Sequence, residues 1–240
     1  MNIRKTNRQI TQELNKIENS LNKKLNAFYN SNIKGSILPT DSLRQKYEQK
    51  VKSMIRKTVQ ESYLYGTKIV TKQISDINTE FVDFISVTDI QNIQQLTDKV
   101  NNQFWKTADR LHRRETEFIL LPDKGLELKN QFDTKAAIIG FAAFASFLPF
   151  NNAVVSKMQS VTLDIGFDIQ QIGELPSQGK VMYLTSEDAK VCDPFTNHNS
   201  PCEPYNRMIF DVKDPEIPEV PRHAFCRCTL LPLIDSSEAF

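Results

Sequence analysis

The chain has 240 residues, of which 40% are hydrophobic, 25% are charged and only 7 are glycine. This composition excludes a disulfide-stapled miniprotein, a collagen-like repeat and a compositionally disordered chain, and it suits one large domain or two modest ones. The net charge of +1 hides an uneven distribution, because residues 1–130 carry 22 basic and 15 acidic side chains whereas residues 131–240 carry 8 and 14.

Apolar periodicity predicts three long amphipathic helices in the first half of the chain. A cap at Thr40 or Asp41 is expected to begin the second helix, and a cap at Thr88 or Asp89 is expected to begin the third. The first helix is expected to end near Asn30. The three apolar stripes cover residues 10–28, 43–74 and 90–111.

The most apolar part of the chain lies between Ala136 and Leu148. We expect Pro149 to end this helix, because proline lacks a backbone N–H and its ring clashes with the preceding turn. A separate amphipathic helix is expected over residues 154–172. The strongly apolar run is about 15 residues long, less than the roughly 20 that a helix needs to cross hydrocarbon. It therefore predicts a buried core helix, and contact with a membrane is not expected.

Short runs with strand character follow the helices, at residues 181–185, 207–212 and 228–234. The fold class predicted is α+β, mainly α, with a long helical arm over residues 1–130 and a compact module with a small antiparallel sheet over residues 131–240. Charged residues interrupt residues 1–24, so no cleavable secretion signal is expected.

Cysteine and histidine gather near the end of the chain and form the densest group of chemically versatile residues. Thiolate and imidazole are the ligands that tetrahedral zinc prefers, and four such ligands complete a structural site. The spacing lacks a paired Cys-x-x-Cys, so buried free thiols and disulfides remain alternatives. The candidate zinc ligands are Cys192, Cys202, His223, Cys226 and Cys228.

Signals for catalysis are few. No nucleophile elbow, phosphate-binding glycine loop or His-Glu-x-x-His motif is present. His112 lies in a basic run on a predicted helix, where an exposed position is expected. Asp211 and Asp214 could bind a divalent cation, although solvated loop carboxylates are commoner. The chain is therefore expected not to be an enzyme.

Residues 1–72 carry 15 basic and 5 acidic side chains. Such a surface can follow DNA phosphates or dock on an acidic protein ring, and it can also be a solvated outer face.

Two C-terminal elements resemble the signature of phage Mu F-like minor head proteins, the phage head morphogenesis family. The first element, Tyr183–Phe195, contains Asp188 and Cys192. The second reads Pro221-Arg-His223-Ala-Phe-Cys226-Arg227-Cys228. The specific resemblance covers residues 150–234. This sequence lacks the second cysteine that the family often has close after the first, and only Cys202 is available.

The resemblance implies a structural component of a tailed-virus head, located in the capsid interior or at the portal vertex and in the host cytoplasm during assembly. It implies contact with the portal or major capsid protein, several copies per particle and a role in genome delivery, with packaged double-stranded DNA as a further contact of the basic arm. Across the two elements, the guanidinium of Arg227 is expected to act as an internal clamp on Asp188 or on a backbone carbonyl. The competing hypothesis is a zinc-stabilised nuclease or toxin-like effector delivered with the genome.

Overall fold

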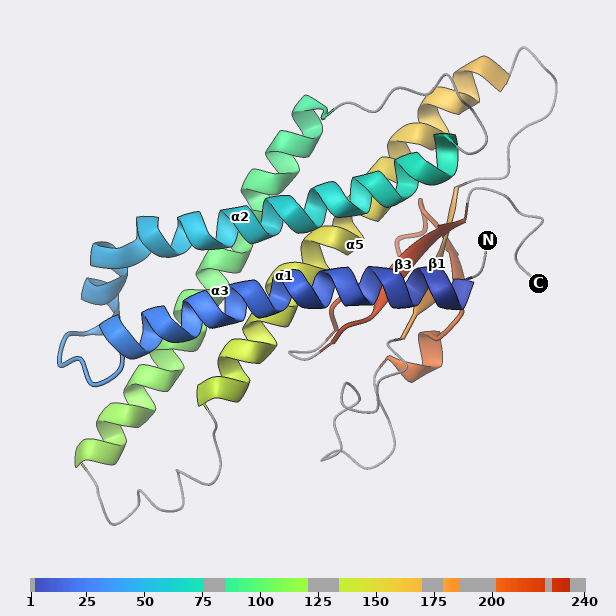
Figure 1. The fold of residues 1–240 in the computed structure, drawn as a ribbon. Helices are drawn as coiled ribbons and strands as arrows, with labels where there is room; N and C mark the ends of the chain where they lie inside the picture. The colour runs from blue at the N-terminus through green and yellow to red at the C-terminus, as the bar shows by residue number, and fades with distance from the viewer. Residues whose placement is uncertain are drawn as a thin grey trace.

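A computed structural model describes residues 3–75, 85–120, 134–169, 179–185, 202–222 and 226–233. The prediction of a mainly helical α+β fold is confirmed (Figure 1). The helices are α1 (Ile3–Asn32), α2 (Thr40–Ser75), α3 (Val87–Leu120) and α5 (Thr134–Ile169), with a 3-10 turn η2 at Glu203–Tyr205. The strands are β1 (Lys180–Leu184), β2 (Ile209–Asp211) and β3 (Thr229–Leu233).

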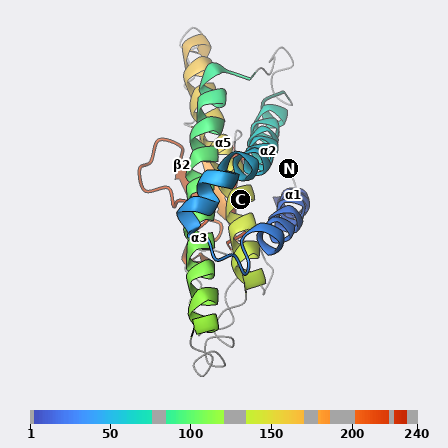
Figure 2. The same cartoon turned by 90° about the vertical axis from the view of Figure 1, so that its left-hand side faces the viewer.

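Helices α1 and α2 run antiparallel and form one layer, which packs across α3 and α5 (Figures 1 and 2). The sheet has the order β2-β1-β3, and both pairings are antiparallel. Strand β3 packs against α5 near the N-terminal end of α1 (Figure 1). The C-terminal elements are thereby brought next to the first helix of the chain.

Helix α3 begins with a reciprocal cap. Ser86 Oγ accepts a hydrogen bond from the Asp89 backbone N–H at 3.0 Å, and Asp89 Oδ2 accepts one from the Ser86 N–H at 2.9 Å. Each side chain satisfies a donor that the helix leaves without an intrahelical partner. The helix starts at Val87, so the capping residue is Ser86 and not the predicted Thr88 or Asp89. Asp89 takes part from within the first turn.

The prediction that Pro149 ends a helix is wrong, because α5 continues through it. An internal proline costs about 3 kcal/mol. Phe147, Leu148 and Phe150 are all fully buried around it, and each such side chain contributes about 1.5–3 kcal/mol. The amide of Asn151 also donates to the Phe147 carbonyl at 2.8 Å. Burial on both sides of the proline therefore outweighs the local break.

Helix α5 contains the segment Ala136–Ser160, whose mean hydropathy of 1.7 and 25-residue length suffice for a membrane span by length and composition. The apolar run is thus longer than the sequence indicated, because it does not stop at the proline. In the structure 78% of that window is buried inside the protein. This burial supports the prediction of a core helix.

The buried hydrophobic residues form two clusters, and each draws on both of the predicted parts. The first joins α1, α2 and α3 to α5 through residues such as Tyr63, Trp105 and Phe141. The second joins Ile10 and Leu14 of α1 to the sheet and the C-terminal cysteines. The helical region before residue 130 therefore packs on the C-terminal elements within the described residues.

Helices α2 and α5 lie in close contact at Gly66, which yields a first prediction. A methyl group at this position would lie 2.6 Å from the Phe150 carbonyl oxygen and 2.8 Å from Ala153 Cβ. Alanine is intrinsically favoured over glycine in a helix by about 1 kcal/mol, but overpacking costs about 1–3 kcal/mol. Gly66→Ala is therefore expected to lower the free energy of unfolding, measured by chemical denaturation.

The control is Ser53→Ala, at an exposed position of the same helix, which should change stability little. Equal or greater stability of Gly66→Ala would contradict the close approach of the two helices.

Candidate metal centre

Three of the four cysteines come together in the C-terminal part of the structure. Cys202 directly precedes η2, and Cys226 and Cys228 precede β3. Their Sγ atoms all lie within 4.8 Å of one another, and the Sγ atoms of Cys202 and Cys226 are 3.7 Å apart. All three are buried, and none is disulfide-bonded to another of the three.

Local structure on both sides fixes this cluster. The Tyr205 backbone N–H donates to the Cys202 carbonyl at 3.1 Å, which closes the η2 turn. On the other side, Asn151 of α5 bonds the outer edge of β3: its amide donates to the Cys228 carbonyl at 3.2 Å, and its oxygen accepts the Leu230 N–H at 2.7 Å. Asn151 thus replaces a neighbouring strand. Pro232 has the same parity as Leu230, so the N–H that it lacks would also lie on this outer edge.

The thiols perturb one another's protonation because they share a buried site. Hydrogen bonding by the Cys202 thiol, and then by the Cys228 thiol, lowers the pKa of Cys226 well below its ordinary 9.0. Hydrogen bonding with Cys202 and Cys226, together with burial, raises the pKa of Cys228. The cluster therefore favours a thiolate at Cys226 that accepts hydrogen bonds, whereas burial opposes a second uncompensated charge.

The donor set fits a soft metal ion. Zinc–sulfur bonds of about 2.3 Å in a tetrahedron place neighbouring sulfurs about 3.8 Å apart, close to the 3.7 Å between Cys202 and Cys226. The three buried cysteines lie close enough to bind a metal. The other predicted ligands, Cys192 and His223, lie outside the described residues.

Arg227 joins this cluster to the first helix. Its Nε and Nη2 atoms donate to Glu18 Oε2 and Oε1 at 2.9 and 2.6 Å. The Arg227 side chain is 18% exposed and that of Glu18 only 4%. A bidentate pair of this kind is among the stronger charge-assisted contacts. The clamp predicted for Arg227 therefore has Glu18 as its partner among the described residues, and Asp188 lies outside them.

Sequence reasoning missed Glu18, although a signal was present. Glu18 lies four residues after Leu14 and three before Leu21, so it falls on the buried apolar stripe of α1. A carboxylate at such a position needs a buried partner. The sequence could have indicated that Glu18 is paired, but not that its partner lies at the other end of the chain.

His112 and the carboxylates of Asp211 and Asp214, which lie outside the cysteine cluster, stabilise loops and turns. The expectation that His112 is exposed is wrong: it is buried, and its Nε2 lies 3.0 Å from the Leu38 carbonyl, which fixes the loop between α1 and α2. Asp211 and Asp214 each accept a backbone N–H two residues ahead, from Lys213 and Glu216. Both carboxylates are thus accounted for by turns.

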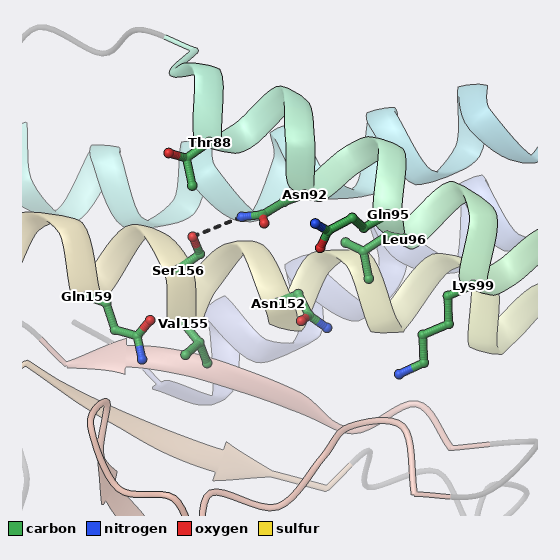
Figure 3. A pocket seen from close by; sticks show the side chains of 9 residues that line it. All are labelled: Thr88, Asn92, Gln95, Leu96, Lys99, Asn152, Val155, Ser156 and Gln159. Carbon is green, nitrogen blue, oxygen red and sulfur yellow. Dashed lines mark hydrogen bonds between the residues drawn. The ribbon is translucent and has the colours of Figure 1, made fainter.

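A surface cavity of about 440 Å³ lies between α3 and α5, apart from the cysteines (Figure 3). The Asn92 amide donates to Ser156 Oγ across it at 3.3 Å (Figure 3). Lys99 pairs with Glu219 at 2.7 Å. Amides and hydroxyls dominate the lining, which holds no acid–base pair. The lining residues are Thr88, Asn92, Gln95, Leu96, Lys99, Asn152, Val155, Ser156 and Gln159.

The buried ion pair gives a second prediction. Arg227→Ala leaves the Glu18 carboxylate buried without this partner, and breaking a buried pair in this way costs about 3–5 kcal/mol. The measurement is chemical denaturation. Arg113→Ala is the matched control, because Arg113 pairs with Asp109 at an exposed surface with its side chain 74% exposed, where ion pairs contribute little. Similar small losses in both variants would contradict a stabilising role for Arg227.

No protein-family model, curated protein or solved structure matches the chain. The resemblance of the C-terminal elements to Mu F-like head proteins therefore depends on the motif residues themselves. Function has to be inferred from those residues and from the geometry around them.

Proposed function

We propose that this chain is a structural, non-enzymatic component of a tailed-virus head: a minor capsid protein associated with the portal and with packaged DNA. The observation that carries the proposal is the placement of Cys226-Arg227-Cys228. Both thiols enter the buried cluster, and the guanidinium between them binds Glu18 of α1. The tripeptide that carries the family resemblance is thus accounted for by structural contacts.

The centre is proposed to hold zinc. Cys202, Cys226 and Cys228 would supply three thiolates, and Cys192 or His223 would supply the fourth ligand. Bound zinc would cross-link the segment before η2 to the segment before β3 and add binding free energy to folding. Such a cross-link suits a small sheet of three short strands, which has little core of its own.

The surface of α1 and α2 is proposed to contact an acidic partner. Lys46, Lys50, Lys57 and Lys68 are exposed and recur at helical spacing along α2. Lys50 Nζ lies 5.7 Å from the centre of the Phe28 ring of α1, so this lysine of α2 lies where the two helices meet. Glu18, one of the five acids in residues 1–72, is buried against Arg227. This further raises the positive excess at the surface, which fits a portal ring or DNA phosphates.

A third prediction tests the metal. Protein purified under reducing conditions is expected to contain about one equivalent of zinc by mass spectrometry and to melt at lower temperature after chelation, because the metal binds only the folded state. Cys226→Ser should lose the metal, since serine does not supply a thiolate. Met182→Leu, a conservative change in the same buried cluster, should keep it. Less than a tenth of an equivalent in the unchanged protein, with no effect of chelation, would contradict the zinc centre.

A fourth prediction tests the partner. The chain is expected to co-purify with portal protein of the same virus, also after nuclease treatment, and imaging should place it against the portal. Combined Lys46→Gln, Lys57→Gln and Lys68→Gln should weaken the complex. The matched triple variant Lys99→Gln, Lys106→Gln and Lys213→Gln changes exposed lysines elsewhere and should leave it intact.

Loss of the complex on nuclease treatment would assign the basic surface to DNA and not to the portal. Metal-dependent plasmid nicking that His223→Ala abolishes would overturn the structural role in favour of a nuclease.

A further inference from the structure

The Tyr183 hydroxyl is a buried polar group whose presence the fold alone does not explain. Tyr183 is fully buried in β1, and its Oη has no well-formed hydrogen bond among the described residues. A buried hydroxyl without a partner costs about 1–3 kcal/mol. Phenylalanine would fill the same space without this cost. Packing alone therefore does not account for the hydroxyl group.

The sheet register places this hydroxyl beside the thiols. Tyr183 lies opposite Leu230 in the β1–β3 pairing, and Cys228 is two residues before Leu230, so both side chains fall on one face. The Tyr183 ring also packs on Tyr205, with centroids 5.7 Å apart, and Tyr205 is bonded to the Cys202 backbone. Burial raises the pKa of Tyr183, and the nearby charge of Cys228 raises it further. This effect agrees with a position close to the thiols.

The chemistry of a loaded centre would give the hydroxyl a partner. Three thiolates around a divalent ion carry a net charge of −1, and in this buried site they have little water to bond. A thiolate sulfur accepts hydrogen bonds, and outer donors of this kind typically change metal affinity 10- to 100-fold. A phenol has an ordinary pKa of about 10, so it is protonated at neutral pH and can donate a hydrogen bond.

We propose that Tyr183 is the outer hydrogen-bond donor of the metal centre, with its O–H directed to a metal-bound thiolate of Cys202 or Cys228. This role rests on the proposed metal centre. Tyr183 does not ligate the ion; it offsets thiolate charge and holds the sulfurs in place. The hydroxyl has no well-formed hydrogen bond in the part of the chain that this structure describes, and it would gain a stronger acceptor when the sulfurs become metal-bound thiolates.

The test compares Tyr183→Phe with Tyr29→Phe in the full chain. Tyr29 is an equally buried tyrosine whose Oη also has no well-formed hydrogen bond among the described residues, but it lies near Glu115 in the other hydrophobic cluster, which contains none of the three cysteines. Cobalt(II) is titrated into metal-free protein and followed by thiolate-to-cobalt absorption, and zinc affinity is then measured by competition with a chelator. Tyr183→Phe is expected to weaken both metals about 10-fold or more, whereas Tyr29→Phe should leave both affinities unchanged.

Stability of the metal-free protein separates a metal role from packing. Tyr183→Phe should be as stable as the unchanged protein or more so without metal, because it removes an unbonded buried hydroxyl. If Tyr183→Phe kept its metal affinity, or lost equal stability with and without metal, the role of Tyr183 would be overturned. The proposed metal centre would not be affected by that result. If the unchanged protein bound neither cobalt nor zinc, the metal centre itself would fail, and the role of Tyr183 with it.

Discussion

The described structure depends most on the buried ion pair between Arg227 and Glu18. It joins the first helix to a segment more than two hundred residues away in sequence, at the point where two cysteines enter the thiol cluster. A second contact reinforces it, because Thr229 Oγ1 donates to Asn7 Oδ1 at 2.9 Å. The N-terminal helix is thus fastened directly beside β3.

A buried pair of this kind is not a simple gain in stability. Removing two charges from water costs several kcal/mol per ion, and their attraction repays this only with good geometry. Both guanidinium bonds to Glu18 are short, which meets that condition. The pair also favours one arrangement, because a shift of α1 along the C-terminal elements would leave the buried Glu18 carboxylate without this guanidinium. It therefore helps to specify how α1 sits on the C-terminal elements.

Helix α5 connects these elements to the rest of the protein. It contacts α1, α2, α3 and β3, and its Asn151 bonds the edge of β3 that no strand covers. An asparagine in an apolar helix is costly unless its amide is satisfied. The Asn151 side chain forms three hydrogen bonds, with Phe147, Cys228 and Leu230. This buried polar residue therefore links the helix to the sheet.

The sequence by itself determined the first three helices, the strands and the concentration of cysteines near the end of the chain, because apolar periodicity and turn residues act over a few neighbouring positions. Tertiary structure alone decided that Pro149 lies inside a helix, that His112 is buried and that Arg227 binds Glu18. Each of these outcomes depends on burial against residues distant in sequence, which local patterns do not encode. The gathering of Cys202 with Cys226 and Cys228 had the same origin: the antiparallel pairing of three short strands brought the segments that carry them together.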